Sequence, residues 1–387
     1  MRNFLKRAAA GAVALAMCAS FAGCYSEDKT WAAKLGDDTL PIGGYIYYLS
    51  SAYSQAAAQV GTDSDVLNAS VEDQSAQDWI KSTAMDTLHS YYFVSQKFQD
   101  LGLTLEEDDQ TAIENATNSM WGYFRTALEP MGVAESSFNQ AYSVYNMKLQ
   151  KLLLAMYGKG GEMELSEDEL RDYYTSGYTY YQYFLVNLST TDENGDSQDM
   201  SDDEKAEVKE RLEDYVKQIN QGRQTLDEAA ANYANTSGTE PNLSEPVAVR
   251  TDSMSTLFSD ALKDLDNDEA AFVDAASYYY VVQKLDIADD FAALLEDQDR
   301  MDNLLIEMRQ EEFRDYTIQQ GAGMDVQVNQ KAIGSVKLSK IADSMGKKGT
   351  SSAESSSESS SSSESSEASS SESSEETSSE EASSSEE

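Results

Sequence analysis

The chain has 387 residues, and its 70 Asp and Glu against 28 Lys and Arg give a formal net charge of −42. Such an acidic surface repels phosphate backbones, so no nucleic-acid partner is expected. Two Cys and one His leave almost no material for Cys-ligated zinc or for nucleophilic catalysis with histidine.

Residues 1–23 are predicted to be a secretory leader. Three basic residues precede an apolar run over residues 8–17, which is too short to cross the hydrocarbon core of a membrane. The following Phe21-Ala22-Gly23-Cys24 resembles the lipobox of bacterial lipoproteins. We therefore predict lipidation of Cys24, with the body held at the outer face of the bacterial cytoplasmic membrane. The alternative is an ordinary signal peptide followed by an incidental cysteine.

Residues 30–165 are predicted to form a mainly helical domain. Two short extended pieces flank a turn at residues 36–38, and apolar residues then recur at helical spacing. The predicted helices cover residues 42–60, 75–101, 106–128 and 134–157.

The pattern changes over residues 166–288. Ser166 followed by Glu169 indicates a capping box and a short helix. Aromatic and β-branched residues predict strands over Tyr178–Leu188 and Tyr278–Leu285, with helical segments between them. This β-α-α-α-β order is that of a small α+β domain.

The end of the chain is predicted to be helical from residue 289 to about residue 320 and extended over Met324–Ile333. Residues 349–387 are almost entirely Ser and Glu, a composition that cannot bury a core, and are predicted to be disordered. The last 37 residues carry 11 of the 42 net negative charges, which leaves −31 on the remainder, so the body is acidic as well.

Three stretches together resemble the PrsA and SurA-type extracytoplasmic foldases, over residues 30 to 335. They read AAKLGDDTLPIGGYIYYL, LSEDELRDYYTSGYTYYQYFLVNLS, and LEDYVKQINQGRQTLDEAAANYA with its sequel to YYYVVQKLD. The resemblance implies an α+β fold with a mainly helical, discontinuous SurA-like chaperone domain. Residues 289–335 would return to the helices of residues 30–165, and residues 166–288 would be an inserted, parvulin-like prolyl isomerase domain.

The resemblance also implies two histidines in the parvulin-like domain, and this chain lacks both. Its first strand reads Tyr183-Phe184-Leu185-Val186, its closing strand carries Tyr280, and a glycine-rich segment is replaced by residues 235–241. The one histidine, His89, lies in the predicted helix of residues 75–101 and is expected to be structural. We therefore expect a degenerate domain whose isomerase activity is lost or severely weakened, with Tyr183 and Tyr280 as core tyrosines rather than a catalytic hydroxyl pair.

The function implied by the resemblance is that of a membrane-anchored chaperone for exported, unfolded proteins. Two alternatives stay open, namely an active parvulin-type isomerase with a divergent site and a scaffold lipoprotein that captures one extracellular partner. No cofactor and no metal are expected, and the acidic stretches of residues 192–196 and 264–268 are interpreted as solvated loops rather than calcium sites. Because aromatic residues suit adaptable contact with unfolded chains, the candidate contact residues are Tyr45, Tyr48, Tyr53, Trp79 and Trp121.

Overall fold

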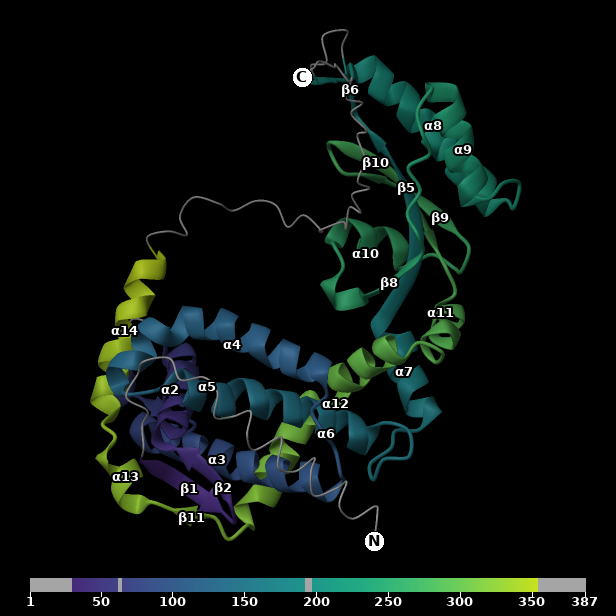
Figure 1. Cartoon of the computed structure of the whole chain (residues 1–387). Coiled ribbons are helices and arrows are strands. Elements are labelled where there is room, and N and C mark those ends of the chain that lie inside the picture. The colour runs from purple at the N-terminus through teal and green to yellow at the C-terminus, as the bar shows by residue number, and fades with distance from the viewer. Residues whose placement is uncertain (1–29, 62–64, 192–196, 354–387) are drawn as a thin grey trace, which may run out of the picture.

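A computed structural model describes residues 30–61, 65–191 and 197–353. The described chain forms a helical body and a smaller α+β insert, which lie side by side (Figure 1). The insert comprises residues 178–284, and the helical body comprises the described residues on either side of it. The prediction of a mainly helical α+β fold is confirmed. Among the described residues, no helix combines the length and the apolar character that crossing a membrane requires.

The helical body begins with an antiparallel hairpin of β1 (Trp31–Leu35) and β2 (Asp38–Pro41), whose turn uses the left-handed Gly36. At the start of the helix Ala76–Asp100 (α3), the Ser75 side chain caps the helix by accepting a hydrogen bond from the backbone of Asp78. The longer elements are α2 (Ile42–Val60), α3 (Ala76–Asp100), α4 (Glu107–Leu128), α5 (Glu135–Phe138), the π-helical turn η3 (Asn139–Val144), α6 (Tyr145–Tyr157) and α7 (Glu167–Gly177). Short elements between α2 and α5 are η1 (Val66–Asn68), β3 (Ser70–Val71), β4 (Gln74–Ser75) and η2 (Glu129–Met131).

The C-terminal part of the chain returns to this body. It forms α11 (Ile287–Leu294), α12 (Gln298–Ala322), β11 (Gln327–Val328), α13 (Gln330–Ser335) and α14 (Leu338–Ala353). Helix α12 packs against α3 and α6, and β11 pairs antiparallel with β1 through Ala33 and Val328. Phe313 of α12 is completely buried, and Thr317 lies 2.7 Å from the hydroxyl of Ser90.

Two sequence-based expectations for this segment and the insert are corrected. The stretch from Met324 to Ile333 is extended only at β11, because the Asn329 side chain caps α13 by accepting from the backbone of Ala332. The insert has more strands than the predicted two. Residues 247–250 and 270–274 add β8 (Val247–Arg250) and β9 (Ala270–Asp274), which pair with β5 (Tyr178–Asn187) and β10 (Tyr278–Lys284).

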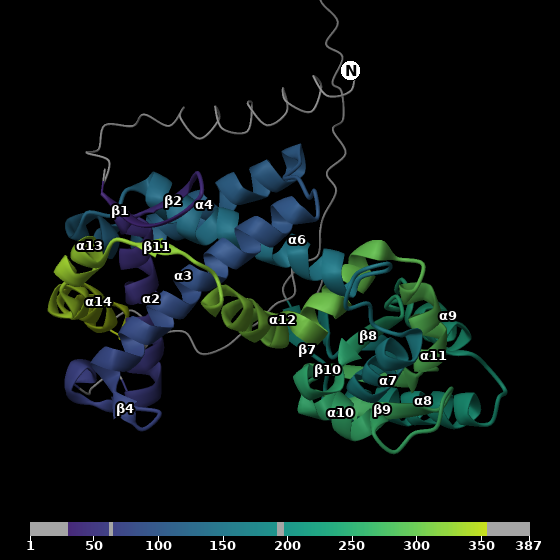
Figure 2. The same cartoon turned by 90° about the horizontal axis from the view of Figure 1, so that it is seen from below.

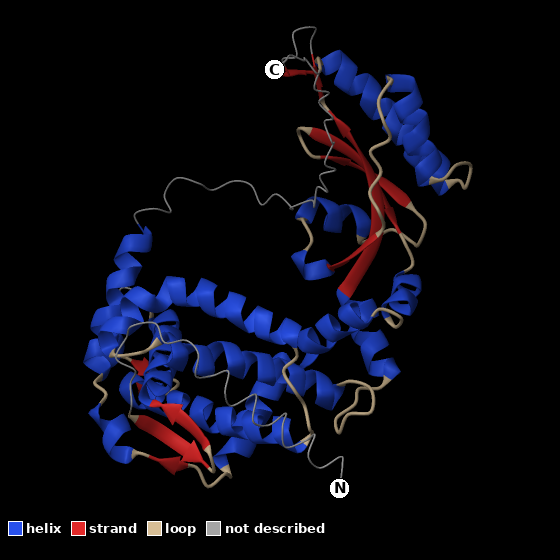
Figure 3. Ribbon diagram, viewed as in Figure 1, coloured by secondary structure: helices blue, strands red, loops and turns tan. Residues whose placement is uncertain are grey.

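The insert is an antiparallel sheet of order β8-β5-β10-β9 with helices on both faces (Figure 3). Alternate residues of β5 point to opposite faces. Phe184 and Val186 share a core with α8 (Asp202–Asn220) and α9 (Leu226–Ser237). On the other face, Tyr181 joins a second core with α10 (Thr256–Leu262). The remaining elements are the hairpin β6 (Ser189–Thr191) with β7 (Ser197–Asp199) and the turn η4 (Thr251–Ser253).

The predicted capping box is confirmed at the start of α7, where Ser166 and Glu169 exchange hydrogen bonds. Two side chains of α7, Leu170 and Tyr174, lie in the core of the helical body and not in that of the insert. Helix α7 therefore belongs to the helical body by its packing, and β5 is the first element of the insert.

Gly321 sets how closely α12 approaches α3. A Cβ atom at this position would lie 2.5 Å from the carbonyl carbon and oxygen of His89 and 2.9 Å from the amide nitrogen of Ser90, all backbone atoms that cannot rotate away. We expect Gly321→Ala to force the two helices apart and to lower the free energy of unfolding by about 1–3 kcal/mol. Chemical denaturation measures the change.

Gly122→Ala is the matched control, because Gly122 also lies inside a helix and a Cβ there meets nothing within 4 Å. That substitution should leave stability unchanged or raise it by about 0.5–1 kcal/mol through helix propensity. Equal stability of the two variants would contradict the close α3–α12 contact.

Candidate functional site

The side chains of the insert that face α10 form an aromatic surface. Tyr183 on β5 and Tyr280 on β10 contact each other edge to face, with ring centroids 5.5 Å apart. Phe258 of α10 contacts both rings, at 5.6 Å and 5.1 Å. All three pack against a buried apolar cluster, which is formed by Tyr181, Leu262, Val273 and Val282. We call Tyr183, Phe258 and Tyr280 the aromatic face.

The rim of the aromatic face is exposed to solvent. Leu257, which precedes Phe258 in α10, is 50 % exposed, and Tyr278, whose ring lies 6.2 Å from that of Tyr280, is 39 % exposed. Six large apolar side chains of the described chain are more than a third exposed, and of these Tyr278 borders the aromatic face through its ring contact with Tyr280. In Figures 1 and 2, α10 lies on the side of the sheet nearer to the helical body, and α8 and α9 cover the outer side.

The aromatic face presents apolar rings together with the phenol groups of Tyr183 and Tyr280. Burial and the neighbouring tyrosines Tyr183 and Tyr278 raise the pKa of Tyr280, so its hydroxyl stays protonated at neutral pH. Neither Tyr183 nor Tyr280 has a hydrogen-bonded hydroxyl partner among the described residues, so the rings are paired but the hydroxyls are not. The one histidine of the chain, His89, lies on α3 in the helical body, so no histidine is available at the aromatic face to act as a general acid or base.

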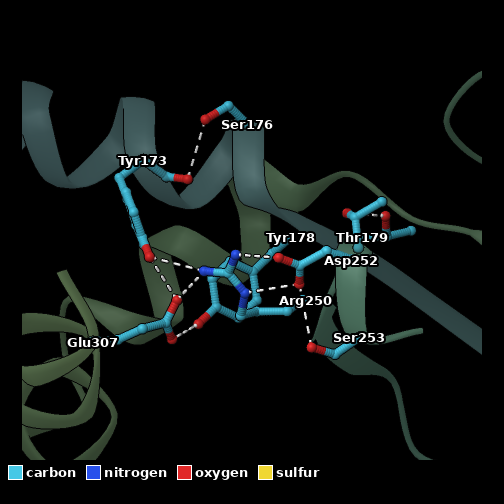
Figure 4. A network of polar contacts seen from close by, with 9 residues as sticks. Tyr173, Ser176, Tyr178, Thr179, Arg250, Asp252, Ser253 and Glu307 are labelled. Carbon is cyan, nitrogen blue, oxygen red and sulfur yellow. Dashed lines mark hydrogen bonds and ion pairs between the residues drawn. The ribbon is translucent and has the colours of Figure 1, made fainter. Parts of the chain in front are cut away.

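A polar junction joins the insert to the helical body (Figure 4). Its centre is Glu307 of α12, which accepts hydrogen bonds from Tyr173 of α7 at 2.7 Å, from Tyr178 at the start of β5, and from Arg250 of β8. Arg250 also donates to the hydroxyl of Tyr173 at 2.8 Å and to Asp252 at 2.9 Å. Three parts of the chain that are far apart in sequence therefore meet at one carboxylate: the consecutive α7 and β5, then β8, and α12.

The charge of Glu307 is stabilised by these contacts. Burial alone would raise its pKa, but the hydrogen bonds from Tyr178, Tyr173 and Arg250 outweigh burial and hold the pKa below the ordinary value. The hydrogen bond from Arg250 likewise lowers the pKa of the exposed Asp252 to about 2. The carboxylates of Glu307 and Asp252 are therefore ionised at neutral pH.

A second polar cluster lies next to the junction, within the helical body. Asp290 of α11 is buried and accepts hydrogen bonds from Arg300 of α12 at 2.6 Å and from Tyr174 of α7 at 2.5 Å. Arg300 also donates to the Tyr174 hydroxyl at 2.9 Å. This cluster ties together the two segments, before and after the insert, through which the chain enters and leaves it.

The five candidate contact residues lie in the predicted helices of the helical body, but their side chains are buried and not exposed. The exposed fractions are 3 % for Tyr45 and Tyr48, 9 % for Tyr53, 7 % for Trp79 and 6 % for Trp121. Each belongs to the apolar stripe by which its helix packs against the other helices. This corrects the expectation, because side chains that form the core offer no surface to an unfolded chain in this structure.

The other predicted positions divide between the described and undescribed parts of the chain. Cys24 and the acidic stretch of residues 192–196 lie outside the described residues. His89 lies half-buried on α3 at the contact with α12. Within residues 30–61, 65–191 and 197–353, no group of three His, Cys, Asp or Glu side chains is placed to hold a metal ion, the 264–268 loop included.

Sequence reasoning did not find Phe258, Arg250 or Glu307. Phe258 occupies an ordinary apolar position of a short amphipathic helix. Its contacts with Tyr183 and Tyr280 depend on the packing of α10 against the sheet, which the sequence does not reveal. Arg250 and Glu307 are 57 residues apart, and no local pattern marks their pairing.

Comparison with known proteins gives a likeness to solved structures, among them the following three. The foldase protein PrsA from Lactococcus lactis matches with 14 % identity and a TM-score of 0.35, covering 82 % of this chain and 99 % of that one. PrsA from Bacillus subtilis matches with 13 % identity and a TM-score of 0.30, covering 68 % and 94 %. PrsA from Streptococcus pneumoniae matches with 14 % identity and a TM-score of 0.31, covering 78 % and 96 %. No protein-family model and no curated protein matches the chain.

Removal of the central carboxylate should loosen the insert. We expect Glu307→Ala to leave Arg250, Tyr173 and Tyr178 without their shared acceptor and to destabilise the docked orientation by about 1–3 kcal/mol. Spin labels on cysteines introduced at the exposed Lys81 and Lys217, in a Cys24→Ser chain without its leader, would report a broadened distance distribution. Lys263→Ala is the control, because Lys263 pairs with Asp260 inside the insert. An unchanged distribution in Glu307→Ala would show that the junction does not hold the two parts together.

Acid should loosen the same junction. Because folding lowers the pKa of Glu307 from its ordinary 4.5, the stabilisation is present above pH 4.5 and is lost as the pH falls through the folded-state pKa. The label distance is therefore expected to stay constant from pH 8 to about pH 5 and to broaden below about pH 4. Glu307→Gln should already be broadened at pH 7 and should change less with acid. A wild-type distribution that does not respond to acid would contradict the role of the ionised carboxylate.

Proposed function

We propose that the protein is an extracytoplasmic chaperone of the foldase type, which binds exported, incompletely folded chains and does not catalyse prolyl isomerisation. The observation that carries this proposal is the aromatic face, an apolar surface whose three rings contact one another and which carries no histidine. The leader, the lipobox-like Phe21–Cys24 and the order of the sequence motifs support the same conclusion.

The aromatic face suits reversible contact with varied apolar segments. An aromatic side chain presents a large apolar area, and each 100 Å² removed from water contributes about 2.5 kcal/mol. A client segment that covers the rim of Leu257 and Tyr278 would therefore be held with useful but reversible affinity. Since apolar contact has no directional requirement, many unrelated sequences would bind.

Prolyl isomerisation asks for more than an apolar surface. The barrier to rotation about the peptide bond is about 18–20 kcal/mol, and lowering it needs polar groups placed against the twisted amide. At the aromatic face the positions where the family resemblance implies histidines are Tyr183 and Tyr280, whose rings contact each other. This geometry favours binding over catalysis.

Lipidation of Cys24 would place the body close to a membrane. Trp31, the first residue of β1, comes seven positions after Cys24, so the tether spans at most roughly 25 Å. We propose that the protein acts at the outer face of the cytoplasmic membrane, where exported chains emerge. Mass spectrometry of the mature protein, which would show a diacylglyceryl mass on an N-terminal Cys24, tests the anchor separately from the activity.

The activity is tested by suppression of aggregation. The wild-type protein should reduce the aggregation of several unrelated unfolded proteins, and Leu257→Ser with Tyr278→Ser should weaken this effect about tenfold or more, because both substitutions remove apolar area from the rim. Leu295→Ser with Tyr123→Ser is the matched control, since it changes the same residue types at exposures of 39 % and 59 % outside the insert. Equal loss in both double variants, or no suppression by the wild type, would overturn the proposed site or the proposed function.

A proline-peptide isomerase assay separates binding from catalysis. The wild-type chain should not accelerate isomerisation above the spontaneous rate, while a client chain should still bind. Clear catalysis that is lost in Tyr183→Phe or Tyr280→Phe would establish a divergent isomerase instead. Binding of one extracellular protein only, with no effect on unfolded substrates, would establish a scaffold.

A further inference from the structure

One edge of the helical body is basic, although the protein as a whole is strongly acidic. From Gln330 to Ala342 the chain contains three lysines and no Asp or Glu. Lys331, Lys337 and Lys340 are all exposed, and none of them forms an ion pair with another described residue. The chain as a whole has 28 basic and 70 acidic residues, so a stretch with three lysines and no acidic residue differs from the average composition of the chain.

The basic stretch lies beside the point where the chain enters the body. Asn329 donates from its side chain to the carbonyl oxygen of Trp31 at 3.0 Å and from its backbone to that of Ala32 at 2.8 Å, which holds the start of α13 against β1. On β1, the Lys34 ammonium lies 5.0 Å from the centre of the half-buried Trp31 ring. We call Trp31, Lys34, Lys331, Lys337 and Lys340 the basic edge.

Both views place α13 and α14 on the side of the helical body remote from the insert (Figures 1 and 2). Strand β1 lies next to them, and α13 contacts β1 and α2. The basic edge therefore lies at the end of the helical body remote from the insert.

We propose that the basic edge is a membrane-contact surface, which binds the headgroups of anionic phospholipids and orients the protein with its insert away from the bilayer. Lysines suit lipid phosphates, and tryptophan is enriched where protein meets the membrane–water interface. The inference is independent of client binding and adds a contact that the proposed lipid anchor does not supply.

The net charge of −42 does not prevent this contact. Charges separated by more than about 8–10 Å are largely screened at physiological salt. The helical body is itself acidic, and three carboxylates lie close to the basic edge: Asp37 three residues after Lys34, Asp343 three residues after Lys340, and Asp65, which lines the same hollow as Leu338 and Ser339. The four lysines of the basic edge outnumber these three. Local charge therefore decides which side faces an anionic bilayer. A short tether raises the local concentration of the surface, so a weak attraction suffices to orient the body.

The test uses the chain that begins at Cys24, which retains every described residue and has Cys24 as its single thiol. Coupling Cys24 to a maleimide lipid supplies the tether chemically, so the result depends neither on biological lipidation nor on chaperone activity. The readout is quenching of tryptophan fluorescence by brominated phosphatidylcholine, in vesicles with or without about 30 % phosphatidylglycerol. Trp79 and Trp121 are only 7 % and 6 % exposed, so a change in quenching reports Trp31, and Trp31→Phe should abolish it.

We expect quenching to be at least about twofold greater with phosphatidylglycerol and the difference to vanish at about 0.5 M salt. Each lysine near an anionic surface shifts the docking equilibrium about fivefold, so Lys331→Glu with Lys337→Glu and Lys340→Glu should abolish the difference. The control, Lys205→Glu with Lys217→Glu and Lys263→Glu, makes the same change of charge in the insert and should retain it.

Three results would overturn the proposal. They are equal quenching in both kinds of vesicle, the same loss in the insert control, and lysine-dependent binding of a soluble glycerol phosphate polymer without lipid-dependent quenching. The last result would assign the basic edge to an anionic polymer in place of the membrane.

Discussion

The contact on which the rest of the structure depends is the packing of α12 against α3. These two 25-residue helices approach so closely at Gly321 that a single methyl group would meet the backbone of His89. Phe313 and Thr317 extend the contact into the core, where Ser90, Tyr145 and Thr317 share hydrogen bonds that would be costly to leave unmade. Without this return of the chain, β1 would lose its partner strand β11 and the apolar stripe of α3 would lie open to water.

The same contact fixes the insert by both of its ends. The chain leaves the helical body through α7 and re-enters through α11 and α12, and the cluster of Asp290, Tyr174 and Arg300 holds these helices together. Glu307 lies further along α12 and reaches Arg250 on an outer strand of the sheet. Since α12 is anchored in the helical body, its contact with Arg250 helps to fix the orientation of the sheet, and so of the aromatic face, relative to that body.

Periodicity predicted the helices of the body well, because each has one stripe of apolar residues at helical spacing. It could not show how exposed any member of a stripe is. Tyr45, Tyr48 and Trp79 were therefore predicted to contact clients when they form the core, and Tyr48 even buries its hydroxyl without a partner. In the insert, the four residues of β8 and the five of β9 are too short for a clear alternation. Their pairing is determined by β5 and β10, which are the long strands that the sequence did predict.

The tyrosines of the helical body and those of the aromatic face differ in whether their hydroxyl groups have hydrogen-bond partners within the described chain. In the helical body, two phenol groups bond to buried partners, although that of Tyr48 does not: Tyr91 donates to Asp38 at 3.0 Å, and Tyr92 accepts from the backbone of Leu40 at 3.1 Å. At the aromatic face, the rings of Tyr183 and Tyr280 pack while their hydroxyls find no such partner in the described chain. A tyrosine held only by its ring can present its apolar face to another surface while its hydroxyl stays in water at the edge, since covering an unpartnered hydroxyl would cost about 1–3 kcal/mol. Under the proposed function, the ring contact of Tyr183 with Tyr280 supplies apolar area for a client chain, which is a use of tyrosine different from that in the helical body.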